Sequence, residues 1–572
     1  MNVLEVRGLQ VSFPGGLSAL RGVDVTVGPG EILALVGESG SGKSVLALAA
    51  LGLLPSSALL SGHVRLGGAD MVTATDAQRR AARRRSAGAV FQDPMTSLNP
   101  TMRVGRQVAE VTGSPREAVD LLDQVGVPEP GRRARQYPHE LSGGLRQRVM
   151  IAMALAGDPA LVIADEPTTA LDVTVQAGIL ELFRELRDSR GTSFVLVTHD
   201  LAVAGEVADR IAVLYAGRMA EVGAAGDVLG RPSHPYTAAL LAARITTRSA
   251  RSRPLPTLAG ELPDPHNPEP GCAFAPRCGA AQQECRTVVP ALEPSPRHAG
   301  QDACIRSGQV ELLADASGLS EGPGWQRPST SSELALQLTG VNRTFGRGRR
   351  SQQVLRGVSL DVPKGGAVAL VGESGCGKST TLRIAVGLDS PDSGDVEYGH
   401  GGRPQLVFQD AGASLTPWAT IGELLAQRLR NERVPQQHWR DRTVETLRLV
   451  GLSERIAERK PHQISGGQRQ RAAIARAIVV PPVLLACDEP ISALDTTLAA
   501  VVLNLLGRLR RELGMALLFV THDLAAARVV ADEIAVMVDG RIVERGPADQ
   551  LLDRPNEAYT RRLVDALPRM SA

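Results

Sequence analysis

Short, fully apolar runs alternate along this chain with segments of helical character. The run from Ile32 to Val36 is followed by a glycine-rich turn and then by a second apolar segment that begins at Val45. Comparable runs occur at Leu161 to Ala164 and at Val368 to Val371. Runs of this kind are typical of strands buried on both faces of a parallel sheet, with helices as the crossover connections. The pattern therefore predicts an α/β fold with a largely parallel central sheet.

The glycine-rich turn after the first run has the composition of a phosphate-binding loop. Its residues are Gly37, Glu38, Ser39, Gly40, Ser41, Gly42, Lys43 and Ser44. The glycines allow the backbone to wrap closely around a polyphosphate, and N–H groups at a helix N-terminus favour the anion. In such a loop Lys43 contacts the β- and γ-phosphates, and the Ser44 hydroxyl ligates Mg²⁺. Because a strand precedes the motif and a helix follows it, we expect a nucleotide site here.

The same arrangement occurs a second time in the chain. The second loop consists of Gly372, Glu373, Ser374, Gly375, Cys376, Gly377, Lys378 and Ser379. Five further pairs share a constant separation of 323 positions: Ser142/Ser465, Asp165/Asp488, Asp172/Asp495, His199/His522 and Tyr236/Tyr559. A constant offset over this span indicates two copies of one domain. We expect the copies at 1–245 and 333–572, joined by a Pro-, Ser-, Gly- and Arg-rich linker at 246–332 with a cysteine-bearing insert at about 254–310.

Each copy carries two adjacent carboxylates where a buried strand ends. Asp165 and Glu166 follow one apolar run, and Asp488 and Glu489 follow another. Parallel sheets bind their ligands at the carboxyl ends of the strands. The pairs therefore suit a division of labour in which the aspartate holds Mg²⁺ and the glutamate polarises the attacking water.

A serine followed by two glycines precedes a helix in each copy, an arrangement that forms an anion-binding nest. These residues are Ser142, Gly143 and Gly144 in the first copy, and Ser465, Gly466 and Gly467, followed by Gln468, in the second. With these motifs the chain resembles the ATPase of an ABC (ATP-binding cassette) transporter whose two nucleotide-binding domains are fused, and the likeness covers nearly all of both halves. The resemblance implies a helical subdomain in each half, ATP and Mg²⁺ as cofactors, and hydrolysis of ATP to ADP and phosphate.

The resemblance also assigns roles to individual residues. It implies an aromatic ring that stacks on adenine, a glutamine that senses Mg²⁺ and contacts the membrane partner, a loop that crosses between the domains, and a histidine that touches the γ-phosphate. The aromatic residues are Phe13 and Phe345, and the glutamines are Gln92 and Gln409. The crossing loops are Thr169–Asp172 and Ser492–Asp495, and the histidines are His199 and His522. For the two phenylalanines, packing in the core is the alternative interpretation.

Domains of this family work as a head-to-tail sandwich, which implies two composite ATP sites within one chain. The first loop would meet Ser465 to Gly467, and the second loop would meet Ser142 to Gly144. ATP then closes the intramolecular dimer and hydrolysis releases it. Both copies retain their carboxylates and histidine, so we expect both sites to hydrolyse ATP. Leu145, where the motif more commonly has glutamine, bears on the rate at the second site.

Four of the six cysteines fall in one stretch, at Cys272, Cys278, Cys285 and Cys304. We expect a cytosolic chain, because residues 1–5 do not have the pattern of a signal peptide and no apolar run is long enough to span a bilayer. In such a chain, clustered cysteines favour a metal over disulfides. Four thiolates bind either zinc or an iron–sulfur cluster. The first gaps are wider than the short zinc knuckle, which favours a [4Fe–4S] cluster, with zinc and unligated thiols as alternatives. Cys376 and Cys487 are most simply small apolar fillers.

The cysteine stretch also resembles the C-terminal extension of the oligopeptide/dipeptide (and nickel) importer ATPases. The supporting residues are His234 to Thr237, the Cys-x-Phe-x-x-Arg-Cys pattern at Cys272 to Cys278, and Thr96 to Pro100. This resemblance implies a peripheral subunit at the cytoplasmic face of the membrane that drives peptide import. Its partners would be two integral-membrane permease subunits and an extracytoplasmic solute-binding protein, with one copy of this chain per transporter.

Net charge, the linker and the two intact sites argue against other classes of protein that carry two such cassettes. The 63 basic and 61 acidic residues leave a net charge of +2, which gives no argument for nucleic acid as a partner. A twin-cassette protein acting on ribosomes would join its cassettes by a charged helical linker, whereas this linker is Pro-rich and bears cysteines. A fused monosaccharide-importer ATPase usually has one degenerate site and no cysteine cluster. A DNA-repair ATPase with cysteine-bound zinc would carry large insertions in its cassettes.

Overall fold

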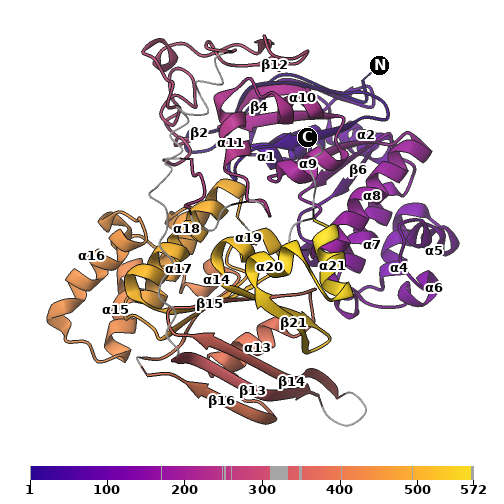
Figure 1. The fold of residues 1–572 in the computed structure, drawn as a ribbon. Helices are drawn as coiled ribbons and strands as arrows, with labels where there is room; N and C mark the ends of the chain where they lie inside the picture. Colours follow the sequence, from indigo (N-terminus) through magenta and orange to yellow (C-terminus); the bar gives the residue numbers. More distant parts are fainter. Residues whose placement is uncertain are drawn as a thin grey trace. The chain divides into compact units, whose positions relative to one another are not determined.

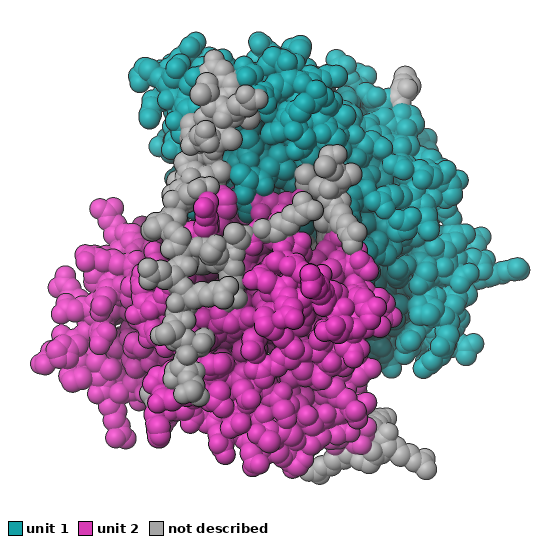
Figure 2. Space-filling model, in the orientation of Figure 1, with its two compact units in different colours: residues 1–243, 257–319, 568–572 teal, residues 244–256, 320–567 magenta. Residues whose placement is uncertain are grey.

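The computed structural model describes residues 2–168, 171–247, 249, 253–258, 260–308, 333–346, 351–400, 402–492 and 494–567. They form two compact units (Figures 1 and 2), one within residues 1–243 and 257–319 and the other within 244–256 and 320–567. Each unit contains one larger sheet and one smaller antiparallel sheet. In the described part of the chain, no helix is both long and apolar enough to cross a membrane.

The larger sheet of unit 1 has the order β11-β12-β10-β9-β3-β8-β7-β6. Its strands are β3 (Ile32–Val36), β6 (Ala87–Val90), β7 (Leu161–Asp165), β8 (Ser193–Thr198), β9 (Arg210–Tyr215), β10 (Arg218–Ala224), β11 (Glu293–Pro294) and β12 (Gln301–Asp302). The five neighbouring strands β9, β3, β8, β7 and β6 run parallel, and β10, β12 and β11 add an antiparallel edge. Every residue of β3 is buried, as expected for a strand covered on both faces. The predicted parallel sheet is confirmed.

The smaller sheet of unit 1 and one helix enclose the first core. The sheet has the order β2-β1-β4-β5 and comprises β1 (Leu4–Phe13), β2 (Leu17–Val27), β4 (Leu59–Leu66) and β5 (Ala69–Asp70). Leu9 and Leu20 from this sheet pack with Leu33 of β3 and with Leu46 of α1 (Lys43–Ala50). The core therefore holds the phosphate-binding loop between a strand and a helix that are both fixed by packing.

A second core of unit 1 lies under a helical region, which confirms the expected helical subdomain. Its helices are α3 (Pro94–Ser97), α4 (Val104–Thr112), α5 (Pro115–Gln124), α6 (Pro130–Arg133) and α7 (Gly143–Leu155). The other helices of the unit are α2 (Asp76–Ser86), α8 (Val173–Arg190), α9 (Leu201–Val207), α10 (Ala225–Gly230) and α11 (Pro235–Ala242). Val108, Leu122 and Val149 supply buried side chains to this core.

Unit 2 repeats this plan. Its larger sheet has the order β17-β18-β19-β15-β20-β21, parallel except for β21. The strands are β13 (Leu334–Phe345), β14 (Gln352–Pro363), β15 (Ala367–Val371), β16 (Ser393–Tyr398), β17 (Gln405–Val407), β18 (Leu484–Asp488), β19 (Ala516–Thr521), β20 (Glu533–Val538) and β21 (Arg541–Pro547). The helices are α13 (Lys378–Ala385), α14 (Ala411–Ser414), α15 (Ile421–Asn431), α16 (Trp439–Leu449), α17 (Gly466–Ile478), α18 (Thr496–Leu513), α19 (Leu524–Val530), α20 (Ala548–Asp553) and α21 (Ala558–Asp565).

The segment between the two repeats is divided between the units. Leu255 is 3% exposed and belongs to the core of unit 2, where its N–H and C=O are both hydrogen-bonded by the side chain of Asn504 at 2.8 Å. Leu258 and Phe274 instead join a core of unit 1. The residues from 260 to 308 thus form a folded insert, the cysteine segment, which packs on unit 1.

Candidate functional site

The first phosphate-binding loop takes a backbone shape that only glycine allows at two positions. Gly37 has φ 154°, and a Cβ there would lie 2.2 Å from the carbonyl oxygen of Leu214. Gly42 has φ 107°, and a Cβ there would lie 2.8 Å from the carbonyl oxygen of Ala19. The loop is therefore seated closely against neighbouring strands, and it leads directly into the N-terminus of α1, an end that favours an anion.

The lysine of each loop is held by the loop itself. Lys43 Nζ donates to the carbonyl oxygens of Gly37 at 2.7 Å and Glu38 at 2.9 Å. Lys378 Nζ makes the same two bonds, to Gly372 at 2.6 Å and Glu373 at 2.9 Å. Each loop thus combines a buried ammonium group with a helix N-terminus, which is an arrangement suited to a polyphosphate.

A hydroxyl and a buried carboxylate meet at the end of the carboxylate strand in both units. Ser379 Oγ donates to Asp488 Oδ1 at 3.2 Å. Burial raises the pKa of Asp165, and a hydrogen bond from Ser44 opposes the shift. Burial likewise raises the pKa of Asp488. Asp165 Oδ1 is buried and has no hydrogen-bond partner among the described residues. Such oxygen donors fit Mg²⁺, whose charge would satisfy the buried carboxylate.

The neighbouring glutamates lie between a glutamine and a histidine. Glu166 accepts a hydrogen bond from Gln92 Nε2 at 2.9 Å, and its other oxygen lies 3.1 Å from His199 Nδ1. In unit 2, Glu489 Oε2 lies 3.2 Å from Gln409 Nε2 and 3.3 Å from His522 Nδ1. The structure thus brings together residues that are far apart in each half of the sequence.

These glutamates are also held in a strained backbone conformation. Glu166 has φ 48° and Glu489 has φ 44°, in the left-handed region that non-glycine residues rarely occupy. Such strain persists where the surrounding structure imposes it, and it is common at functional sites. Burial raises the pKa of Glu489, but the hydrogen bond and charge of His522 outweigh burial and lower it. The same contact raises the pKa of His522 despite burial, so both partners favour their charged forms.

The two serine–glycine motifs differ at one residue with a structural consequence. Ser142 begins α7 and accepts the N–H of Leu145 at 3.4 Å, while Ser465 begins α17 and accepts the N–H of Gln468 at 3.3 Å. Gln468 returns a bond, because its Oε1 accepts the Ser465 N–H at 3.1 Å. Leucine has no acceptor, so the first motif has only one half of the capping box.

Of the other residues expected at the nucleotide sites, the two aspartates cap helices and the two phenylalanines differ in exposure. Asp172 and Asp495 are N-caps of α8 and α18, accepting the N–H groups of Val175 at 2.9 Å and Leu498 at 3.0 Å. Phe13 is half-buried against the first core of unit 1. Phe345 is 41% exposed beneath the guanidinium of Arg343. Thr169, Ala170 and Ala493, which belong to the predicted crossing loops, lie outside the described residues.

The four clustered cysteines line one small cavity, together with Phe274 and the first residue of α11, Pro235. All are free thiols, and burial raises the pKa of Cys272, Cys278 and Cys304, the last to about 12. The shared cavity is what the structure shows of the expected four-cysteine site. Among the described residues, however, no group of three or more side chains is arranged to hold a metal ion.

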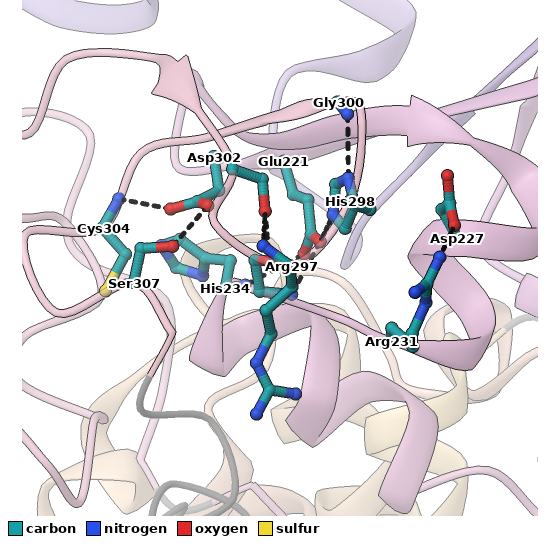
Figure 3. A network of polar contacts seen from close by, with 12 residues as sticks. Glu221, Asp227, Arg231, His234, Arg297, His298, Gly300, Asp302, Cys304 and Ser307 are labelled. Atoms are coloured by element: carbon teal, nitrogen blue, oxygen red, sulfur yellow. Dashed lines mark hydrogen bonds and ion pairs between the residues drawn. The ribbon is translucent and has the colours of Figure 1, made fainter.

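A buried polar network fixes the cysteine segment to the edge of the sheet (Figure 3). Glu221 of β10 is fully buried and accepts hydrogen bonds from the N–H groups of Ser233 at 2.8 Å and His234 at 3.1 Å, and it lies 2.8 Å from His298 Nε2. Burial lowers the pKa of His234 to about 4, so this ring stays neutral at physiological pH. Asp302 accepts the N–H of Cys304 at 3.2 Å. The network connects the cysteine cavity to β10.

Sequence reasoning missed a second attachment of the cysteine segment. Arg277 donates to both carboxylate oxygens of Glu38, in the first phosphate-binding loop, at 2.6 and 3.0 Å. The Glu38 N–H in turn donates to the hydroxyl of Tyr236 at 2.9 Å. The return of Tyr236 as Tyr559 at the common offset was the available signal that this tyrosine belongs with the nucleotide site.

Comparison with known families agrees with this geometry. The model described as "ABC transporter" matches residues 20–169 and 355–492, which include both phosphate-binding loops. The chain belongs to the ABC transporter family. As an ABC protein it is an ATPase, and the two matched regions show that it contains two cassettes. A further model, "Oligopeptide/dipeptide transporter, C-terminal region", matches residues 220–285 and 543–572 of this ABC ATPase.

Relatives of this ABC ATPase match it from end to end. The oligopeptide transport ATP-binding protein OppD of Mycobacterium tuberculosis is 40% identical, over 99% of this chain and 98% of the relative. The glutathione import ATP-binding protein GsiA of Salmonella typhimurium is 37% identical, over 99% and 90%. A solved dimeric cassette, MJ0796 bound to ADP and Pi, is 32% identical over 37% of this chain and 98% of its own, with a TM-score of 0.35.

Proposed function

We propose that this ABC ATPase drives the import of peptides across the cytoplasmic membrane, acting as a peripheral subunit on its inner face. The observation that carries the proposal is the match to OppD across both cassettes and the cysteine segment. The match of residues 220–285 to the oligopeptide/dipeptide transporter model supports it, because that region includes three of the four clustered cysteines.

Within each cassette we assign the residues by their contacts. Ser44 with Asp165, and Ser379 with Asp488, would hold Mg²⁺, which when bound offsets charge on the phosphates. Glu166 and Glu489 would accept the proton of the attacking water, since each is held between a glutamine and a histidine. The glutamines, Gln92 and Gln409, would sense the bound Mg²⁺ and contact the membrane partner. The histidines, His199 and His522, would contact the γ-phosphate.

The sites would be completed within one chain. Ser465, Gly466 and Gly467 would bind the phosphates held by the first loop, and Ser142, Gly143 and Gly144 those held by the second. Each motif opens a helix of 13 residues, whose N-terminal N–H groups favour an anion. One chain per transporter would then supply both ATP sites.

The partners would be two membrane-embedded permease subunits and an extracytoplasmic solute-binding protein. A groove on unit 2 is lined by the exposed apolar side chains of Leu388, Tyr398 and Phe408, the last adjacent to Gln409. Phe91, adjacent to Gln92, is 40% exposed in unit 1. Exposed apolar surface beside the glutamine of each cassette suits a partner helix that responds to the nucleotide.

The proposal is tested by purifying the full chain from detergent-solubilised cells and identifying what accompanies it. We expect two multi-spanning permeases, and peptide uptake by vesicles that contain the complex should depend on ATP. Ribosomal proteins, or the absence of any membrane protein, would contradict the transport function while leaving the ATPase assignment intact.

We also propose that the cysteine segment holds a [4Fe–4S] cluster, with zinc as the second choice. All four thiols line one cavity, and four thiolates are the ligand set of such a cluster. Bound by the cluster, the sulfurs would lose their protons despite a burial that now raises the pKa of three of them. Its position near a domain boundary favours a structural role.

Chain purified without oxygen is expected to contain about four iron and four sulfide per molecule. Cys278→Ser should lower the iron content at least severalfold, because it removes a ligand. Cys487→Ala, which changes a buried thiol on β18 outside the cavity, serves as the matched control. Stoichiometric zinc in place of iron would show the second choice to be right, and absence of both would show unligated thiols.

A further inference from the structure

We propose that Arg277 is a positioning residue for the first ATP site, through which the cysteine segment sets the shape of the first phosphate-binding loop. Arg277 lies in the Cys-x-Phe-x-x-Arg-Cys pattern, directly before Cys278, and it contacts Glu38 of the loop. The contact joins positions 239 residues apart. It is separate from the family assignment of nucleotide ligands and from the proposed cluster.

The Arg277–Glu38 pair is a buried, two-pronged ion pair. The side chains are 5% and 6% exposed, and two guanidinium nitrogens each donate to a different carboxylate oxygen. Arg277 also lies 3.3 Å from the hydroxyl of Tyr215. Burial lowers the pKa of Arg277, but the bonds and charge of Glu38 outweigh burial and raise it above its usual value. Two planar groups paired in this way fix orientation as well as distance.

Glu38 transmits this constraint to the groups that meet the phosphates. Its N–H donates to Tyr236 Oη at 2.9 Å, and its carbonyl oxygen accepts from Lys43 Nζ at 2.9 Å. Side chain, N–H and carbonyl of one residue are therefore each bonded to a different part of the protein. A shift of Glu38 would move one of the two acceptors that orient Lys43.

The rest of the pattern supports the same contact. Phe274 is 2% exposed and packs edge-on against Tyr215, with ring centroids 5.3 Å apart, and also against Tyr236 at 5.5 Å. Cys272 and Cys278 bracket Phe274 and Arg277 and line the cysteine cavity. The spacing of the pattern thus places Arg277 on Glu38 of the loop, Phe274 on the two tyrosines that contact this pair, and two thiols in the cavity.

The second cassette provides an internal comparison. Glu373 N–H donates to Tyr559 Oη at 3.1 Å, so the tyrosine bond is common to both loops. The counterpart of Tyr215 is Val538, because Leu214 and Met537 supply the carbonyls that approach Gly37 and Gly372. Valine has no hydroxyl for a guanidinium group. Arg277 and Tyr215 therefore act on the first site.

Without Arg277 the Glu38 carboxylate would be left buried and unpaired, which is strongly unfavourable, and the loop would rearrange to solvate it. One hydrogen bond between charged groups, such as that from Lys43 to a phosphate, contributes about tenfold to 100-fold in affinity. We therefore expect Arg277→Gln, which displaces an acceptor that orients Lys43, to weaken ATP binding at the first site by about tenfold to 100-fold.

The experiment uses the full chain and a fluorescent ATP analogue under conditions without hydrolysis. The Lys378→Ala background impairs the second site, so that binding reports the first site. In this background Arg277→Gln should raise the Kd by about tenfold to 100-fold. In the Lys43→Ala background, which reports the second site, the same substitution should change the Kd less than about twofold. Arg286→Gln, an exposed arginine of the same segment, is the matched control and should change neither.

The double variant Glu38→Gln/Arg277→Gln separates the ion pair from a general loss of structure. Removing both charges leaves no unpaired carboxylate, so most of the lost affinity should return. An unchanged first-site Kd in Arg277→Gln would overturn the proposal. So would an equal loss at both sites, or a double variant as weak as the single one.

Discussion

Replacing Glu166 and Glu489 together by glutamine is expected to lower ATP hydrolysis by about 10²–10⁴-fold while ATP binding persists. The amide has the size of the carboxylate but cannot accept a proton from water. Its oxygen can still accept a bond from Gln92 or Gln409, so the local geometry should survive. Steady-state phosphate release and the Kd for ATP, measured on the same preparation, check the two halves of this expectation.

The single variants, Glu166→Gln and Glu489→Gln, show how much of the ATP hydrolysis each site contributes. Both glutamates have the same strained backbone and the same pair of neighbours, so each single variant should lose at least about half of the activity. Glu181→Gln, an exposed carboxylate on α8, is the matched control and should keep full activity. If either single variant at Glu166 or Glu489 retains full activity, its site does not hydrolyse ATP. Full activity in the double variant would remove both glutamates from the mechanism.

Replacing a loop lysine by alanine is expected to weaken ATP binding at its own site by at least about 100-fold. Lys43 and Lys378 each present a buried ammonium group at the start of a helix. Two charge-assisted hydrogen bonds to phosphate contribute about 1.5–3 kcal/mol each, and both are lost with the side chain. Calorimetric titration with ATP and Mg²⁺ should show two binding events in the parent chain and one in each variant.

The loop lysine also holds the loop when no nucleotide is bound, so stability must be measured alongside affinity. Lys43→Ala removes one hydrogen bond each from the carbonyls of Gly37 and Glu38, and a small fall in melting temperature should accompany the loss of binding. Lys364→Ala, which removes an exposed lysine paired with Glu333, should alter neither quantity appreciably. Two undiminished binding events in Lys43→Ala would contradict the assignment of the first loop.

Features that depend on contiguous residues were predictable from the sequence. A phosphate-binding loop is a strand, a turn and a helix in immediate succession, and its glycines are required by local φ angles, as at Gly37. The constant offset predicted the second cassette, and the alternation of apolar runs with helical segments predicted the parallel sheet. Asp172 could also have been predicted as a helix N-cap, because aspartate before an apolar helical segment is a standard signal.

Features created by tertiary packing were not predictable. Glu38 and Arg277 are 239 positions apart, and neither belongs to a periodic pattern that would indicate a buried ion pair. Leu255 lies in a stretch read as linker, yet Asn504, 249 positions away, bonds both of its backbone groups. The cysteine spacing suggested a metal but could not indicate that all four thiols line one cavity.

The larger sheets of the two units differ at the edge formed by their antiparallel strands, and this affects how each avoids association with other proteins. In unit 1, Gln301 and Asp302 of the cysteine segment pair with Val222 and Glu221 of β10, so that an inserted strand takes up the backbone groups of that edge. In unit 2, β21 is the outermost strand described, with Arg541, Glu544 and Arg545 along it and proline at its end. Charges and proline discourage a strand from another chain from adding to an open edge. The first cassette is thus shielded from edge-to-edge aggregation by an added strand, and the second by its side chains.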